Sequence, residues 1–233
     1  TLWNVTNTSD SGFLLTGNIS SIGEGLTDMY AVKVDSDGEV DWYNAYGTEH
    51  GESVTDAIQT ADGGYCLTGY LNIGGAISCG IVIRTDPGGE EICRRLFIDN
   101  EDNVIFKNAT AIVETPDGGF GVLRNGYDFS AVFGRINSEG ELLWISEQRI
   151  GGSINNDAYS LLLLEDFGYL LGGSAGRIGD WLVRTEPDSL SVSAWDLQAT
   201  EAHDFGNVNI DSTLAFDLTL TNAAGYPLYI HRI

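Results

Sequence analysis

The first residues in this sequence that could do chemistry form a glycine-rich segment around a serine. Gly172-Gly173-Ser174-Ala175-Gly176 fits the G-x-S-x-G pattern of a hydrolase nucleophile. That chemistry needs the serine on a strand–turn–helix elbow, with a histidine and an acid beside it. The segment ends an expected strand with no helical pattern after it, and the chain has only three histidines. We therefore interpret it as a loop and predict no catalytic residues.

A second candidate is an acidic turn that resembles half of a calcium-binding loop. Asp35, Asp37 and Asp41 bring carboxylates together around a glycine, and calcium takes about six to eight oxygen ligands. The equivalent turns at 86–89 and 137–140 lack this set. An ordinary hairpin turn, in which Asp and Gly have their usual roles, is the alternative explanation. We keep these three aspartates as candidate calcium ligands and predict no other cofactor.

The third candidate is a basic residue that recurs in a very acidic chain, at steps of 49–51 residues: Lys33, Arg84, Arg135 and Arg184. One interpretation is a ring of cations that lines a central channel and binds anions. The other is that each cation pairs with an acid of its own or the next repeat, with Asp28 and Asp180 as candidate partners. Buried charges need partners, so repetition at one structural position favours pairing.

Two further markers recur in phase with these cations. An acid, a variable residue and a glycine precede an apolar strand at Asp10, Asp62, Asp117 and Asp166. The other marker follows at steps of 51 residues and consists of Trp42, Cys93, Trp144 and Trp195. A period near 50 residues with several short strands in each unit is typical of a β-propeller blade.

The sequence therefore predicts an all-β fold with four blades of four antiparallel strands. We place the blades at about residues 1–47, 48–99, 104–150 and 155–197. Four blades are the low end for a closed propeller, so they form either a complete small ring or part of a larger one.

Residues 1–196 resemble a family of secreted bacterial and archaeal propeller repeats. The residues that carry the resemblance are Thr60-Ala61-Asp62-Gly63-Gly64-Tyr65 with Gly69, Asp28-Met29-Tyr30-Ala31-Val32-Lys33, and Asp35-Ser36-Asp37-Gly38 with Trp42. Departures from the family pattern are Cys79 for an aspartate, Cys93 for a tryptophan and Phe167 for a glycine. The resemblance implies the fold and says little about activity.

Residues 198–233 are similar to the opening of an immunoglobulin-like surface domain of the Hydin or choice-of-anchor type. The matching segments are Asp204-Phe205-Gly206-Asn207-Val208, Leu220-Thr221-Asn222 and Pro227-Leu228-Tyr229-Ile230. Such a sandwich takes about 100 residues, so we expect this segment to be a truncated domain or to be completed by another chain. Strand addition between copies would make residues 198–233 a site of homo-assembly.

The net charge of −23 comes from 34 acidic and 11 basic residues. Such a field repels nucleic acid and anionic membrane surfaces, and no apolar run reaches the 18 or so residues of a membrane span. The three cysteines lie in the second repeat, where Cys66 and Cys79 could face each other and form a disulfide. Cys93 replaces a tryptophan marker, so we expect a buried thiol there.

Four sequons permit an exported glycoprotein and give candidate glycosylation sites at Asn4, Asn7, Asn18 and Asn108. We expect a non-enzymatic extracellular or cell-surface protein of an archaeon or bacterium. Its propeller would be a structural or binding module for a protein or glycan partner. The alternative is a carbohydrate-active enzyme, a glycoside hydrolase or lyase that uses acids of the channel.

Overall fold

The computed structural model describes residues 1–20, 22, 26–74, 77–97, 108–125, 131–148, 156–165, 167–175, 179–185, 219–221 and 227–229. These residues form strands and turns, and within these ranges there is no helix. The prediction of an all-β chain is therefore confirmed. The described part of the chain also lacks any helix with the length and apolar composition needed to cross a membrane.

The strands form antiparallel sheets whose members follow one another in sequence order. The first sheet holds β1 (Leu2–Asn7), β2 (Phe13–Ile19), β3 (Asp28–Val34) and β4 (Val40–Tyr46). The second holds β5 (Gly51–Gln59), β6 (Tyr65–Gly74), β7 (Ile77–Thr85) and β8 (Glu91–Leu96). The third holds β9 (Asn108–Glu114), β10 (Phe120–Asn125), β11 (Ala131–Ile136) and β12 (Leu142–Gln148).

The last repeat shows three strands: β13 (Asn156–Leu163), β14 (Tyr169–Ala175) and β15 (Gly179–Arg184). The predicted fourth strand near Trp195 lies outside the described residues. In the C-terminal segment, β16 (Thr219–Thr221) pairs with β17 (Pro227–Tyr229), antiparallel. The rest of the predicted immunoglobulin-like segment also lies outside the described residues.

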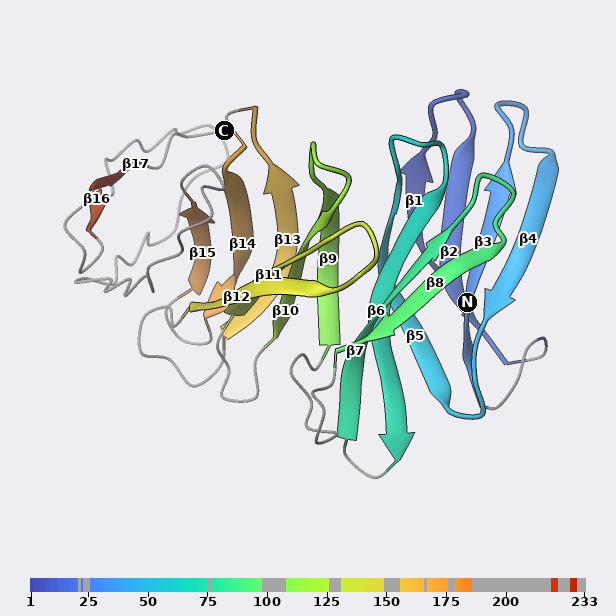
Figure 1. The fold of residues 1–233 in the computed structure, drawn as a ribbon, viewed down its shortest axis with the longest axis horizontal. Coiled ribbons are helices and arrows are strands. Elements are labelled where there is room, and N and C mark those ends of the chain that lie inside the picture. Colours follow the sequence, from blue (N-terminus) through green and yellow to red (C-terminus); the bar gives the residue numbers. More distant parts are fainter. Residues whose placement is uncertain are drawn as a thin grey trace, which may run out of the picture.

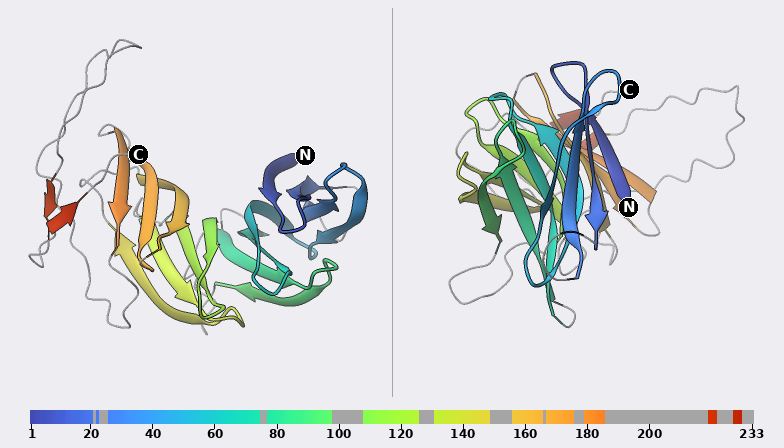
Figure 2. Two further views of the ribbon diagram at one scale, coloured as in Figure 1. Left: turned by 90° about the horizontal axis from the view of Figure 1, so that it is seen from above. Right: turned by 90° about the vertical axis from the view of Figure 1, so that its right-hand side faces the viewer.

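The four larger sheets lie one after another along a curve that is open on one side (Figures 1 and 2). The first strands of successive sheets, β1, β5, β9 and β13, contact one another in sequence. The described sheets form an open arrangement, so they do not display the closed ring of a complete propeller.

An apolar core fills each space between consecutive sheets. Between the first two sheets, Leu14, Met29 and Ala31 pack against Leu67 and Ile83. Two equivalent clusters join the second sheet to the third and the third to the fourth. Since both faces of the middle sheets are covered, their strands have the nearly continuous apolar runs seen at residues 81–83.

The same irregularities recur in each repeat. The first strand carries a β-bulge, which lies at residues 2–4 in β1, 54–56 in β5, 109–111 in β9 and 158–160 in β13. In the first three sheets, the fourth strand carries another, next to Lys33, Arg84 and Arg135 of the third strand. A bulge bends a strand and increases its twist, so its repetition gives the sheets a common shape for stacking.

Asp56 joins the first strands of three sheets. One carboxylate oxygen accepts hydrogen bonds from Asn4 Nδ2 of β1 at 3.0 Å and from the Ala57 amide at 2.9 Å. The other accepts from the Ile112 amide of β9 at 3.0 Å. Burial raises the pKa of Asp56, although these hydrogen bonds act in the opposite direction. Asp56 therefore satisfies donors on both neighbouring sheets.

We expect Asp56→Ala to lower the free energy of unfolding by about 3 kcal/mol, because it leaves donors of two other sheets without their charged acceptor. Chemical denaturation would measure the change. The matched control is Asp37→Ala, which removes an exposed acid and should change stability by less than about 0.5 kcal/mol. Equal effects of the two substitutions would mean that Asp56 does not join the sheets.

Candidate functional site

The hairpin between the first two strands has the same backbone in every repeat. In the first, the Thr8 amide donates to the Gly12 carbonyl and the Ser11 amide donates to the Thr8 carbonyl, both at 3.0 Å. The same two bonds form in the hairpins at 60–64, 115–119 and 164–168. The fourth residue of each turn has a positive φ: 69° at Ser11, 84° at Gly63, 77° at Gly118 and 64° at Phe167.

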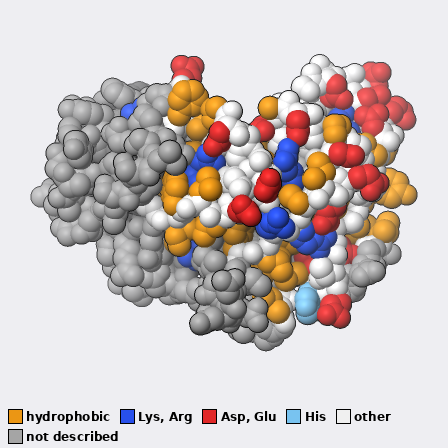
Figure 3. All heavy atoms as spheres, in the orientation of Figure 1, with side chains coloured by type: hydrophobic (Ala, Val, Ile, Leu, Met, Phe, Trp, Pro, Cys, Tyr) orange, Lys and Arg blue, Asp and Glu red, His pale blue; other side chains and the backbone are white. Residues whose placement is uncertain are grey.

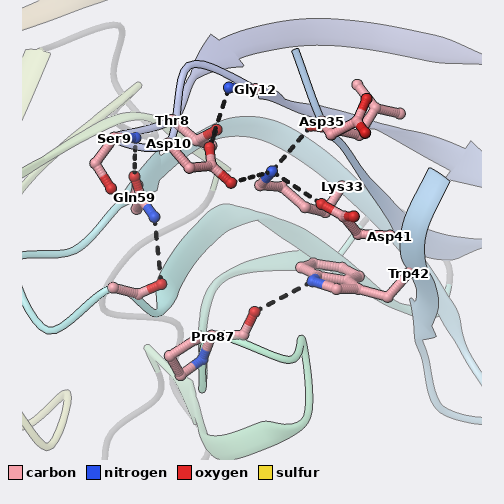
Figure 4. A network of polar contacts seen from close by, with 12 residues as sticks. Thr8, Ser9, Asp10, Gly12, Lys33, Asp35, Asp41, Trp42, Gln59 and Pro87 are labelled. Carbon is pink, nitrogen blue, oxygen red and sulfur yellow. Dashed lines mark hydrogen bonds and ion pairs between the residues drawn. The ribbon is translucent and has the colours of Figure 1, made fainter. Parts of the chain in front are cut away.

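The aspartate of the first turn links it to the third strand (Figure 4). Asp10 Oδ1 accepts hydrogen bonds from the Thr8 hydroxyl at 2.5 Å and from the Gly12 amide at 3.0 Å. Asp10 Oδ2 accepts from Lys33 Nζ at 2.7 Å. Lys33 is almost fully buried and also donates to the Val34 carbonyl at 2.9 Å and to Asp41 at 3.2 Å.

The next two repeats form the same network. Asp62 accepts from the Thr60 hydroxyl, the Gly64 amide and Arg84. In the third repeat, Asp117 accepts from the Thr115 hydroxyl at 2.6 Å, the Gly119 amide at 3.1 Å and Arg135 Nη2 at 2.8 Å. In the fourth repeat Leu164 replaces the threonine, and Asp166 lies outside the described residues. We call the aspartate, threonine, glycine amide and cation of one repeat a turn clamp.

The clamps perturb the pKa values of their members in the directions expected for ion pairs. Hydrogen bonds from Lys33, Thr8 and Gly12 lower the pKa of Asp10 well below its usual range. Hydrogen bonds from the threonine, then the glycine amide and the arginine, lower the pKa values of Asp62 and Asp117. Burial acts to lower the pKa of Lys33, but the bonds to Asp10 and Asp41 outweigh it, so this pKa is raised.

For three of the four recurring cations, the clamps support the interpretation that each cation pairs with an acid. Lys33, Arg84 and Arg135 each pair with an acid of their own repeat. The acids are the turn aspartates, and Asp41 is a second partner of Lys33. The aspartate and the cation are two markers in phase with each other, but phase alone does not show which markers are in contact.

A second repeated turn connects the second sheet to the first and the third sheet to the second. The turn at 86–89 between β7 and β8 lies against β4 of the first sheet. Trp42 Nε1 donates to the Pro87 carbonyl at 3.1 Å (Figure 4). Both Asn44 Nδ2 and the Tyr46 hydroxyl donate to the Gly89 carbonyl, at 2.8 and 2.7 Å. Gly89 has a φ of 81°, and a Cβ there would lie 2.7 Å from the Trp42 ring. Only glycine fits this contact without displacement.

The third sheet contacts the second in the same way. The turn at 137–140 lies near the second sheet, where Arg84 Nη1 donates to the Ser138 carbonyl at 3.0 Å. A Cβ on Gly140 would lie 2.4 Å from Arg95 Cγ, and Arg95 occupies the repeat position of Asn44. The recurring tryptophan position therefore marks the strand that receives the next turn, a role that the sequence analysis missed.

Two of the three candidate calcium ligands, Asp35 and Asp41, have other partners, and Asp37 is exposed. Asp35 Oδ1 accepts from the Asp37 and Glu39 amides, both at 2.9 Å, which is the usual role of an aspartate in a turn. Asp41 contacts Lys33. In the described ranges, no three side chains from His, Cys, Asp or Glu gather in a way that could hold a metal ion.

The predicted pairing of Cys66 with Cys79 needs correction. In the β6–β7 hairpin, Cys66 lies opposite Arg84, whereas Cys79 lies opposite Leu71. The two residues are therefore offset along the strands, and Cys66, Cys79 and Cys93 are free thiols. Cys66 and Cys79 are buried and Cys93 is partly exposed. Burial raises the pKa values of the Cys66 and Cys79 thiols.

Three of the four sequon asparagines bond to a neighbouring strand or sheet. Asn4 donates to Asp56, Asn18 donates to Ser53 Oγ at 3.2 Å, and Asn108 accepts from Ser78 Oγ at 2.7 Å. Asn7 is exposed, so it is the sequon asparagine most open to a glycan. The serine of the G-x-S-x-G segment lies within β14, opposite Asp157 and Asp180, and no helix follows it in the described residues.

We expect Asp117→Asn to change how the free energy of unfolding depends on pH in the acidic range. Because the folded-state pKa of Asp117 is lowered, its contribution is fully present above the unfolded-state pKa of about 3.9 and is lost as pH falls below that value. The variant should be about 1 kcal/mol less stable at pH 7 and should lose less stability on acidification. Thermal melts from pH 7 to pH 3 measure both effects. Asp37→Asn is the control, and identical profiles for the two variants would contradict the clamp.

We expect Phe167→Gly to stabilise the chain by roughly 1 kcal/mol, because a bulky side chain at a φ of 64° is strained and this one is largely exposed. Gly118→Ala is the matched control at the equivalent turn position. A Cβ on Gly118 would meet no atom within 4 Å, so the loss there isolates the backbone cost. Unfolding in denaturant measures both changes. Destabilisation by Phe167→Gly would contradict the conclusion that the backbone of Phe167 is strained.

The comparisons with known proteins give information about the fold of this chain and none about its function. No protein-family model matches the chain, and no curated protein matches it. Among solved structures, it is similar to the crystal structure of a protein of unknown function from Bacteroides caccae, with a TM-score of 0.52 and 16% sequence identity. The match covers 80% of this chain and 57% of the other, so this chain spans little more than half of that protein.

Proposed function

We propose that this chain is a non-enzymatic extracellular or cell-surface protein whose sheets are blades of a β-propeller with a structural or binding role. The observation that carries the proposal is the turn clamp, present in three successive repeats. It gives the recurring charged residues of these repeats a structural task. Because the clamps hold the turns in place, such repeats are suited to present a fixed surface to a partner.

The propeller arrangement is supported by the order of strands and by the contacts between sheets. Each sheet runs from first to last strand in sequence order, and the first strands of consecutive sheets lie together. In a propeller, blades of four strands surround a common axis in this order. The likeness to the B. caccae structure concerns the fold alone.

The state of four buried or hydrogen-bonded acids, the three clamp aspartates and Asp56, supports a role without catalysis. A general acid needs a proton near neutral pH, and a general base needs access to its substrate. The clamp aspartates have lowered pKa values and accept three hydrogen bonds each. The pKa of Asp56 is raised, but both its oxygens accept bonds from the protein.

The proposed location rests on surface chemistry. Acidic side chains gather over the β1–β4 side of the molecule in Figure 3. With a net charge of −23, the surface suits an environment rich in cations and not one of nucleic acid. The exposed sequon at Asn7 and the resemblance to secreted repeats agree with export. The partner would be a protein or a glycan of the cell surface, and residues 198–233 offer a further route to assembly.

An assay of binding against turnover tests the proposal. The chain would be incubated with a panel of soluble and insoluble polysaccharides, and reducing ends and unsaturated products would be measured. Binding to the same panel and to cell-surface protein extracts would be measured in parallel. We expect retention by at least one surface component and no turnover of any polysaccharide.

Turnover could also come from a contaminating enzyme, so acid variants serve as controls. Asp157→Asn and Asp180→Asn remove the carboxylates on either side of Ser174, whereas Asp37→Asn removes an exposed acid of a turn. Turnover that one of the first two variants abolishes and Asp37→Asn preserves would overturn the non-enzymatic role in favour of a carbohydrate-active enzyme.

A further inference from the structure

Three hairpin turns of this chain contain an aspartate followed by a glycine. The pairs are Asp37-Gly38, Asp62-Gly63 and Asp117-Gly118. An aspartate can react with the amide nitrogen of the next residue, and glycine, which has no Cβ, leaves that nitrogen unhindered. The three glycines have similar positive φ values, 84°, 84° and 77° in chain order. The structure therefore allows one reaction to be compared at three equivalent places.

The backbone hydrogen bonds of the three turns match. The Gly38 amide donates to the Asp35 carbonyl at 3.2 Å, and the Asp35 amide donates to the Glu39 carbonyl at 2.9 Å. The turns at 60–64 and 115–119 form the same pair of bonds, at 2.8–2.9 Å. The backbone therefore does not distinguish the three aspartates from one another.

The surroundings of the carboxyl groups do differ. Asp62 and Asp117 belong to turn clamps, so a threonine hydroxyl, a glycine amide and an arginine hold each carboxylate. Asp37 is exposed, and its carboxylate has no hydrogen-bond or ion-pair partner among the described residues. The Asp37 amide is held by Asp35 Oδ1 at 2.9 Å. The backbone at Asp37 is thus fixed while its carboxyl group is free to turn.

The exposure of Asp37 is a property of its position in the turn. The equivalent residues Gly88 and Glu139 are also exposed, although their turns pack against the preceding sheet. The preceding sheet covers the next position instead, where Gly89 and Gly140 are buried. A sheet packed against this turn in the same way would therefore still leave Asp37 open to water.

We propose that Asp37-Gly38 is a site of spontaneous isoaspartate formation and that the turn clamps protect the other two pairs. The Gly38 nitrogen attacks Cγ of the protonated Asp37 carboxyl group, an N–Cγ bond forms, and the carboxyl OH leaves as water with the amide proton. Water then opens the five-membered ring. Cleavage at Cγ restores aspartate, whereas cleavage at the main-chain carbonyl carbon leaves the chain running through the former side chain. This chemistry does not depend on the role proposed above for the chain.

A clamp opposes this reaction in two ways. The carboxyl group must give up its hydrogen bonds to reach the amide nitrogen, and a charge-assisted bond such as that from Arg135 to Asp117 is among the stronger ones. The neutral carboxyl group is also the better electrophile. Hydrogen bonds from the threonine and the other clamp donors lower the pKa values of Asp62 and Asp117, so less of the neutral form is present.

Peptide mapping of the aged full chain tests the proposal. The folded protein would be kept at mildly acidic pH, below its melting temperature, and isoaspartate in each of the three peptides would be quantified by chromatography and by labelling with an isoaspartate methyltransferase. We expect about tenfold more at Asp37 than at Asp62 or Asp117, the factor that corresponds to about 1.4 kcal/mol for breaking a clamp. The chain unfolded in denaturant is the control, and there the three pairs should react at similar rates.

Thr115→Val removes one donor from the clamp of Asp117 and nearly keeps the size of the side chain. We expect it to raise isoaspartate at Asp117 and to leave Asp37 unchanged, and thermal melting checks that the variant is folded. Equal accumulation at the three pairs of the folded, unchanged chain would overturn the proposal. So would a folded chain that stays intact at Asp37 while the unfolded chain reacts, or a folded variant in which Asp117 remains protected. The comparison within the unchanged chain needs no substitution, so it decides the matter even if the variant does not fold.

Discussion

The pairing of a buried cation with a turn aspartate is the interaction on which the rest of this structure depends. Lys33 and Arg135 lie almost fully out of water, whereas Asp10 and Asp117 are more than half exposed on the turns. A buried cation needs an acid as its partner, so the turn stays where the carboxylate reaches the third strand. Because the same carboxylate holds a threonine and a glycine amide, one residue fixes a hairpin and its neighbouring strand together.

Once the clamps and bulges have given each sheet the same shape, neighbouring sheets pack on it in one way. The bulges recur at the same positions, and the turn at 86–89 meets the strand of Trp42 as the turn at 137–140 meets the strand of Arg95. The apolar faces then form the three cores between sheets.

The sequence predicted the elements better than it predicted the contacts between them. The spacing of Asp62, Arg84 and Cys93 was enough to place strands and turns, since period and turn chemistry are local. It could not show that Asp62 itself is the partner of Arg84, because that depends on how a hairpin folds over the third strand. Asp56 was missed because a residue that occurs in one repeat gives no periodic signal. The offset of Cys66 from Cys79 follows from the hairpin register, which the loop between the two strands sets.

Native-state hydrogen exchange at the Gly64 and Gly119 amides tests the clamp most directly, since each amide donates to the aspartate of its turn. If the clamps fix the turns, both amides exchange only through large-scale unfolding, as slowly as the amides of the central strands β6 and β10. Exchange of these two amides at the rate of an unstructured peptide, while β6 and β10 stay protected, would contradict the account.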